Sequence, residues 1–180
     1  MPIEEIIVPT TEPETEWVAG RALQKMSQTR DHSRVQLAFG IALSAWANGR
    51  GEVGTEWRFR LGVSGEALRP LVPDLSFVAH DRLRGRTDEE IQAPTFAPTV
   101  AVEILSRGDD PRDVASKVDV YLRAGCELVI VADPETRSMV VRDGHVTITF
   151  EQDDVLCHGV LPGFRLALAP FFARALDRRS

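Results

Sequence analysis

The chain has 180 residues, of which 43% are hydrophobic and 27% charged, and its formal net charge at pH 7 is −6. This length suits one domain with a substantial core, and the composition is that of an ordinary globular protein. The acidic balance excludes a general electrostatic coat on nucleic acid, and no apolar run approaches the roughly 18 residues that a membrane span needs. The N-terminus has no basic region leading into an apolar one, so we expect a cytoplasmic protein without a signal peptide.

The first part of the chain divides into a polar segment and the start of the ordered domain. Residues 1–15 are rich in proline, threonine and glutamate, and we expect them to form a flexible or loosely docked segment. A single domain is expected over residues 16–180. At its start, residues 17–26 favour two short extended pieces around a turn at Ala19 and Gly20.

Residues 32–47 predict a helix, with Asp31 as its N-cap and Asn48-Gly49 at its end. Apolar side chains leave this helix little polar surface, so we expect it to be buried across most of its girth.

Residues 53–61 alternate with period two and predict one continuous strand. Its polar positions include Glu56 and Arg58, so Glu56 is expected on an exposed face. The following segments are a glycine-containing loop at residues 62–72, a strand at 73–79, and a polar connection at 80–98 with one helical turn at 88–91.

Residues 100–106 organise the rest of the chain, because they are small or apolar except for the carboxylate of Glu103. Both alternating faces are apolar, which is typical of a strand covered on both sides. An unpaired charge in such a strand is costly, so Glu103 needs a partner, a metal ion or access to water. Two interpretations stay open here: a buried ion pair or turn cap, and a functional carboxylate near the carboxyl end of the strand, where open α/β sheets place their ligands.

After this strand, an aspartate cap followed by Pro111 predicts a helix that runs to Ala124 and stops at Gly125. Residues 126–132 form a second apolar strand, so the three elements predict a parallel crossover unit. The remaining elements are a hairpin of residues 138–142 and 145–150 around Asp143-Gly144, short strands at 155–156 and 164–168, and a closing helix at 170–176. The sequence therefore predicts a mixed α/β fold with a central mixed sheet flanked by helices.

The two cysteines, Cys126 and Cys157, have no metal-binding spacing and form no disulfide framework, so we interpret both as reduced packing residues. No glycine-rich phosphate loop, G-x-S-x-G or H-E-x-x-H motif is present, and the one tyrosine, Tyr121, is interpreted as a core residue. Local basic patches that could contact nucleic acid are Arg58/Arg60, Arg82/Arg84/Arg86, Arg107/Arg112 and Arg174/Arg178/Arg179.

Three charged residues are expected to meet at one edge of the sheet. Asp74 opens its strand and Glu103 lies late in its own, so antiparallel neighbours would bring the two carboxylates together. Stepping about 100° per residue around the helix places Lys117 on the flank of the apolar stripe, from which it either extends to water or reaches the carboxylates. Two close carboxylates repel each other unless they share a proton or a cation, and hard divalent cations prefer such oxygen ligands.

These residues resemble the restriction-endonuclease family of bacterial PD-(D/E)XK nucleases. The resemblance covers nearly the whole chain, because the N-terminal half also matches through Glu16, Gly20 and His32. The other matching segments are Pro73-Asp74, Val102-Glu103-Ile104-Leu105-Ser106, Lys117, Tyr121-Leu122-Arg123-Ala124-Gly125 and Val131-Ala132-Asp133-Pro134.

The resemblance implies a restriction-endonuclease-like fold and a metal-dependent endonuclease that hydrolyses phosphodiester bonds in DNA. Asp74 and Glu103 would hold Mg²⁺, with Mn²⁺ as a substitute, to stabilise the charge on phosphorus and lower the pKa of a bound water. Lys117 would orient that water or offset the developing charge. The lysine of the XK motif is replaced by Leu105, so the resemblance transfers its role to Lys117.

The resemblance further implies DNA as the partner, contacted through local basic patches, and it leaves a homodimer open. Glu56 and His32 could flank the pocket, although the first is also interpreted as an exposed-face residue and the second as an ordinary N-terminal helix residue. The alternative function is a non-catalytic nucleic-acid or protein interaction module on the same fold, which the acidic net charge and Leu105 favour. A third class, an unrelated small-molecule metalloenzyme, would need a closed pocket.

Overall fold

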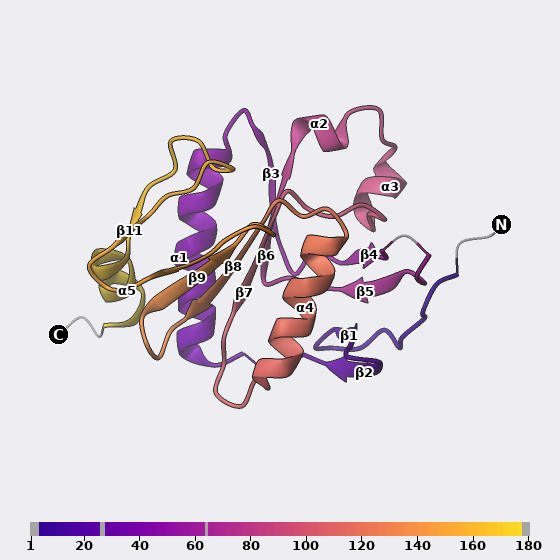
Figure 1. Ribbon diagram of the computed structural model, residues 1–180, viewed down its shortest axis with the longest axis horizontal. Helices are drawn as coiled ribbons and strands as arrows, with labels where there is room; N and C mark the ends of the chain where they lie inside the picture. The colour runs from indigo at the N-terminus through magenta and orange to yellow at the C-terminus, as the bar shows by residue number, and fades with distance from the viewer. Residues whose placement is uncertain (1–3, 26–27, 64, 178–180) are drawn as a thin grey trace.

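A six-stranded mixed sheet forms the centre of the computed structural model, which describes residues 4–25, 28–63 and 65–177 (Figure 1). In spatial order the strands are β10 (Thr147–Phe150), β9 (Ser138–Arg142), β8 (Leu128–Asp133), β7 (Val100–Ile104), β6 (Leu75–Ala79) and β3 (Gly51–Thr55). β7 and β8 run parallel, and the other neighbouring pairs run antiparallel. The prediction of a mixed α/β fold around a central mixed sheet is confirmed.

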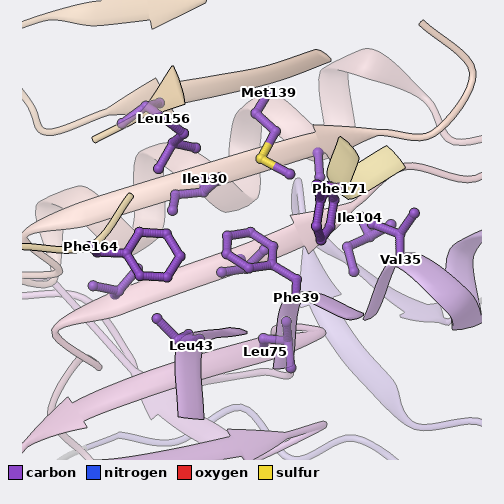
Figure 2. Packing of buried hydrophobic residues seen from close by; sticks show 14 of the residues in the cluster. Val35, Phe39, Leu43, Leu75, Ile104, Ile130, Met139, Leu156, Phe164 and Phe171 are labelled. Carbon is purple, nitrogen blue, oxygen red and sulfur yellow. The ribbon is translucent and has the colours of Figure 1, made fainter. Parts of the chain in front are cut away.

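The strand predicted to be covered on both sides is β7, and all five of its residues are buried. On one face, Val102 and Ile104 pack with α1 (Arg30–Ala47) and α5 (Leu168–Leu176) in the cluster of Figure 2. On the other face, Ala101 packs in a second cluster with α4 (Pro111–Arg123). Apolar side chains on both faces of β7 therefore connect two helical layers through one sheet.

The crossover unit is also confirmed, since α4 connects the parallel strands β7 and β8. Asp110 caps the helix by accepting a hydrogen bond from the backbone N–H of Arg112 at 2.8 Å, and Pro111 occupies the first helical turn. Gly125 ends the helix with φ of 99°, a left-handed conformation that costs glycine little.

The predicted hairpin is β9–β10, and the carboxylate of Asp143 closes its turn by accepting from the backbone N–H groups of His145 and Val146, each at 2.9 Å. These two hydrogen bonds lower the pKa of Asp143. The chain then forms β11 (Val155–Leu156) and β12 (Leu166–Ala167), which pair with each other, and α5 follows directly.

The expectations for α1 are wrong in two respects. Thr29, and not Asp31, is its N-cap, because the Thr29 hydroxyl accepts from the backbone N–H of His32 while Asp31 lies inside the first turn. The helix is also not buried all round, since Leu37 and Ile41 are 66% and 64% exposed. The sheet and α5 cover only part of the helix surface, so apolar side chains on the opposite side stay in contact with solvent.

The continuous strand predicted for residues 53–61 is wrong as well. β3 ends at Thr55, and Glu56 takes a left-handed conformation with φ of 51°, which turns the chain out of the central sheet. The chain continues as β4 (Phe59–Leu61), which pairs with β5 (Arg69–Leu71) inside the segment predicted as a loop. Period-two patterning cannot detect this break, because the side-chain alternation continues across it.

Near the N-terminus, the predicted pair of extended pieces is β1 (Thr15–Val18) and β2 (Arg21–Gln24), joined by a turn with positive φ at Ala19 and Gly20. Met26, the last residue of that prediction, lies outside the described residues, as do residues 1–3. Of the segment before β1, Glu5 bridges to Leu68 in parallel. The connection after β6 contains α2 (His80–Leu83) and α3 (Asp88–Gln92). No helix in the described ranges combines the length and apolar character needed to cross a bilayer.

The two cysteines differ in environment, which gives a test of the fold. Both are unpaired, but Cys126 is buried and Cys157 exposed, so the packing role expected for Cys157 is wrong. Burial raises the pKa of the Cys126 thiol to about 12. A thiol reagent such as Ellman's reagent should therefore modify one cysteine rapidly in the native protein and the second only after denaturation. Cys157→Ser should abolish the rapid reaction, and two rapid thiols in the native protein would contradict this packing.

Candidate active site

Asp74 lies immediately before β6, beside the end of β7, and is 2% exposed. Its Oδ2 accepts from the backbone N–H of Ile104 at 2.7 Å and lies 3.2 Å from His32 Nε2, while its Oδ1 accepts from Lys25 Nζ at 2.7 Å. Burial alone would raise the pKa of Asp74. The hydrogen bond from His32 and the charge of Lys25 outweigh that effect and hold the pKa well below its usual range, so the carboxylate is ionised.

Glu103, on β7, accepts hydrogen bonds from two side chains of α4. Its Oε2 accepts from Lys117 Nζ at 2.7 Å and its Oε1 from the hydroxyl of Tyr121 at 2.8 Å. Lys117 Nζ also donates to Glu16 Oε2 at 3.0 Å, and Glu16 Oε1 accepts from the backbone N–H of Val72. The Lys117 ammonium therefore pairs with two buried carboxylates. Through Glu16, β1 is connected to α4 and to the segment before β6.

Burial shifts the two partners of this ion pair differently. Burial and the neighbouring carboxylates of Asp74 and Glu16 raise the pKa of Glu103 to about 7, although Lys117 opposes the shift. For Lys117, burial lowers the pKa, but the attraction of Glu103, Glu16 and Asp74 is larger and raises the pKa above its usual value. The lysine is thus protonated at neutral pH, while Glu103 can hold a proton when no other cation is near.

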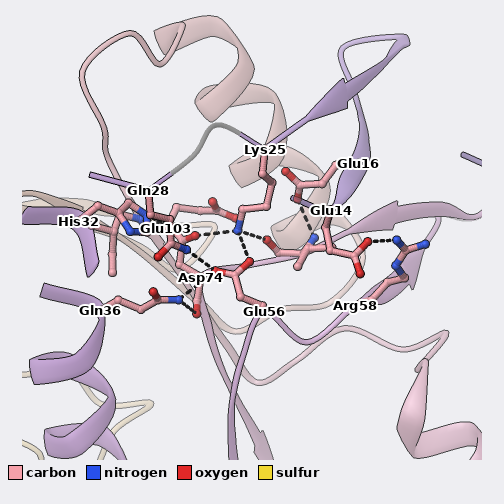
Figure 3. A network of polar contacts seen from close by, with 12 residues as sticks. Glu14, Glu16, Lys25, Gln28, His32, Gln36, Glu56, Arg58, Asp74 and Glu103 are labelled. Atoms are coloured by element: carbon pink, nitrogen blue, oxygen red, sulfur yellow. Dashed lines mark hydrogen bonds and ion pairs between the residues drawn. The ribbon is translucent and has the colours of Figure 1, made fainter. Parts of the chain in front are cut away.

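Lys25 forms the second half of the network, shown in Figure 3. Its Nζ donates to Glu56 Oε2 and Asp74 Oδ1 at 2.7 Å each and to the carbonyl oxygen of Val72 at 3.0 Å. Gln36 orients the same groups, donating to Glu56 Oε1 at 2.9 Å and to the Asp74 carbonyl oxygen at 2.8 Å. Burial lowers the pKa of Lys25, but Asp74 and Glu103 raise it by more, so the ammonium stays charged.

Asp74, Glu103 and the two lysines line a pocket of about 320 Å³ between the β1–β2 hairpin, the start of α1 and the loop after β7. A larger pocket of about 460 Å³ between α1 and α5 is mainly apolar and has no acidic residue in its lining, so it does not compete as a hydrolytic site. The lining of the smaller pocket includes Glu16, Lys25, His32, Asp74, Glu103 and Lys117.

The ion-pair network of the two lysines holds more negative than positive charge. Two ammonium groups face four carboxylates, which are those of Glu16, Glu56, Asp74 and Glu103. Within the described ranges no three His, Cys, Asp or Glu side chains are arranged to hold a metal ion. Carboxylate and carbonyl oxygens nevertheless already surround one cation, the Lys25 ammonium, and such hard oxygen donors fit Mg²⁺ or Mn²⁺.

The three residues expected to meet, Asp74, Glu103 and Lys117, line this one pocket, and Lys117 contacts Glu103 directly. Their roles in catalysis and metal binding stay predictions. His32 reaches Asp74 from the first turn of α1, and Glu56 is bound by Lys25 instead of lying free on an exposed face. Leu105, at the XK position, lines the pocket next to the end of β7 and supplies no charge.

Sequence reasoning missed Lys25, Gln36 and the hydroxyl of Tyr121, and included Glu16 only through the resemblance. One compositional signal could have found Lys25. Lys25 and Lys117 are the chain's only two lysines among 21 basic residues, the rest being arginine, and both lie in this pocket. A compact ammonium suits a narrow buried site better than a planar guanidinium does.

The raised pKa of Glu103 predicts a pH-dependent stability. Between pH 4.5, where the unfolded carboxyl loses its proton, and pH 7, the folded protein binds more protons than the unfolded chain. The unfolding free energy of the metal-free protein should therefore fall as pH rises across this interval, by up to about 3 kcal/mol. Urea denaturation in EDTA at a series of pH values measures the effect. Glu103→Gln should flatten this slope, and parallel slopes for variant and wild type would contradict the prediction.

Comparison with known proteins agrees with this fold. Residues 4–169 match the Uma2 family, described as "Putative restriction endonuclease". A crystal structure from Anabaena variabilis ATCC 29413, described as "a putative nuclease belonging to DUF820", superposes with a TM-score of 0.82 at 24% identity, covering 94% of this chain and 95% of that chain. No curated protein matches the sequence. The family match spans most of the chain, and the protein therefore belongs to the Uma2 family of restriction-endonuclease-like proteins.

Proposed function

We propose that this protein is a metal-dependent DNA endonuclease that hydrolyses phosphodiester bonds. The observation that carries the proposal is the buried pair of Glu103 and Lys117, 2.7 Å apart, in the same pocket as the ionised Asp74. Two carboxylates for a cation and a fixed positive charge are what phosphodiester hydrolysis requires. Membership of a family described by restriction endonuclease activity supports the nuclease class.

In this proposal Asp74 and Glu103 hold Mg²⁺, or Mn²⁺ in its place. The bound ion supplies charge stabilisation at phosphorus and lowers the pKa of a coordinated water. Hydrogen bonds from the backbone N–H of Ile104 and from the Tyr121 hydroxyl keep one oxygen of each carboxylate in position. The two ligands are therefore oriented before any ion arrives, which lowers the reorganisation needed for binding.

Lys117 acts as a fixed cation and hydrogen-bond donor. Its raised pKa keeps it protonated at neutral pH, so it does not serve as a general base. Glu16 accepts a second hydrogen bond from the ammonium, at 3.0 Å, and so acts as a positioning residue for it. From that position Lys117 would orient the attacking water or offset charge that develops on the phosphate.

DNA is the proposed partner, and arginines near the pocket mouth are the candidates for backbone contacts. Arg107 and Arg112 flank the loop after β7, and their side chains are 85% and 91% exposed. Arg21 lines the pocket itself. Arg178 and Arg179, from another sequence patch, lie outside the described residues. Phosphate contacts of this kind give affinity without sequence specificity.

One observation favours the alternative, a non-catalytic interaction module on the same fold. Asp109, Asp110 and Asp113 also line the pocket, and these carboxylates repel phosphate when no cation is present. Leu105 in place of the XK lysine also favours the non-catalytic alternative. Absence of cleavage by the wild-type protein across Mg²⁺, Mn²⁺ and several DNA forms would favour this alternative.

The cation requirement can be tested without DNA. Because four carboxylates share two ammonium groups, millimolar Mg²⁺ or Mn²⁺ should raise the melting temperature of the wild-type protein by mass action. The double variant Asp74→Asn/Glu103→Gln should lose this rise, as measured by differential scanning fluorimetry. An equal rise in the double variant would mean that the ion binds elsewhere.

Lys117→Met tests the proposed role of the lysine. The substitution keeps the length of the side chain and removes its charge, and should slow plasmid cleavage by about a hundredfold or more, as loss of one preorganised electrostatic group does elsewhere. Arg123→Met on the same helix is the matched control, because Arg123 pairs with Glu66 and Asp119 and is absent from the pocket lining. Thermal melts of both variants check folding. Equal cleavage by wild type and a folded Lys117→Met would exclude the catalytic role.

A further inference from the structure

We propose that Lys25 is an internal competitor of the divalent cation, so that its ammonium must leave Asp74 before a metal ion can bind there. The inference rests on the proposed function, since it concerns how the same cation enters the site. It assigns to Lys25 a role distinct from that of Lys117, which contacts Glu103 and Glu16.

The hydrogen bonds of Asp74 leave a metal one accessible oxygen. Oδ2 is taken by the backbone N–H of Ile104 at 2.7 Å and faces His32 Nε2 at 3.2 Å, and the backbone bond cannot be released without moving β7. Oδ1 has a side-chain ammonium as its partner, Lys25 Nζ at 2.7 Å. A metal ion that binds Asp74 therefore needs Oδ1, the atom that Lys25 occupies.

The position of the ammonium has the chemistry of a hard-cation site. Three oxygens surround Lys25 Nζ: Asp74 Oδ1, Glu56 Oε2 and the carbonyl oxygen of Val72, at 2.7, 2.7 and 3.0 Å. They use all three donors of the ammonium. Gln36 holds Glu56 and the Asp74 backbone in place independently of Lys25. When the lysine withdraws, Asp74 Oδ1 becomes available to the cation that Asp74 and Glu103 would hold, with Glu56 Oε2 and the carbonyl oxygen of Val72 as neighbouring oxygen donors.

Lys25 is placed so that it can withdraw. It follows β2, which pairs only with β1 in its two-stranded sheet and has three of its four residues exposed. β1, in contrast, is fixed by Glu16, which binds both Lys117 and the backbone N–H of Val72. Rotation of the flexible four-carbon stem of Lys25 would move the ammonium out of the oxygen cluster while these anchors stay intact.

The experiment compares Mn²⁺ binding by isothermal titration calorimetry in the wild type, Lys25→Met and Arg21→Met, without DNA. Arg21 is the matched control, because it lines the same pocket from the same hairpin and pairs with Asp113 at 2.7 Å, away from the three oxygens. Removing the competitor in Lys25→Met should tighten Mn²⁺ binding at least tenfold. Arg21→Met should change the affinity much less, because it removes only general positive charge.

Thermal melts supply a second readout. Metal-free Lys25→Met should melt below the wild type, because Asp74 and Glu56 lose their counter-ion, and Mn²⁺ should raise its melting temperature by more than that of the wild type. Lys25→Gln keeps amide donors to the carboxylates and removes the charge, so it should fold if Lys25→Met does not. It too should bind Mn²⁺ more tightly than the wild type.

Several outcomes would overturn the inference. Unchanged or weaker Mn²⁺ binding in the Lys25 variants would show that the ammonium does not compete. Equal tightening in Arg21→Met would reduce the effect to general electrostatics. Tightening that persists in Lys25→Met/Asp74→Asn would place the ion away from Asp74. Absence of Mn²⁺ binding in every protein would overturn the proposed metal site as well as this inference. Mn²⁺ binding that depends on Asp74 but is equally tight with and without Lys25 would overturn this inference alone.

Discussion

The candidate site depends on one electrostatic constraint: the carboxylates of Glu16, Glu56, Asp74 and Glu103 share the ammonium groups of two lysines. Lys117 pairs with both Glu16 and Glu103, and Lys25 pairs with both Asp74 and Glu56. Burial removes the water that would otherwise screen these charges, so each oxygen needs a donor from the protein. Those donors come from Lys25 after β2, from β7, α1 and α4, and from Val72 before β6. The same hydrogen bonds therefore connect the elements to one another and set the chemistry of the pocket.

The carboxylates of Asp74 and Glu103 are held firmly by the sheet and by α4, whereas the ammonium of Lys25 is held less firmly. Asp74 is bound to the backbone N–H of Ile104, so the sheet fixes it, and Glu103 is held by two side chains of α4. Lys25, at the end of an exposed strand, has only its own side-chain contacts to hold its ammonium in the site. A firmly held acidic frame opposite a less firmly held ammonium is the arrangement that the proposed exchange of Lys25 for a divalent cation requires.

Leu105, directly after β7, occupies the XK position, where the resemblance would otherwise place a lysine. A lysine from α4 reaches the Glu103 carboxylate instead, because the helix lies beside β7 and packs against one face of the sheet (Figure 1). The charge thus approaches the same carboxylate from a different element.

The sequence by itself determined the elements whose signals are local. Apolar residues on both faces predicted β7, a cap with Pro111 and Gly125 delimited α4, and Asp143-Gly144 marked the hairpin. The expectation that Asp74, Glu103 and Lys117 gather also came from sequence, because strand position and helical periodicity constrain where side chains point.

Only the tertiary structure decided the left-handed break at Glu56, the exposed side of α1, and the entry of Lys25 and Glu16 into the pocket. Lys25 lies 49 residues from Asp74 along the chain, and Lys117 lies 101 residues from Glu16. Contacts over such separations leave no periodic pattern in the sequence. They exist because folding of the whole domain buries these charges together, where each must be neutralised by a partner of opposite charge.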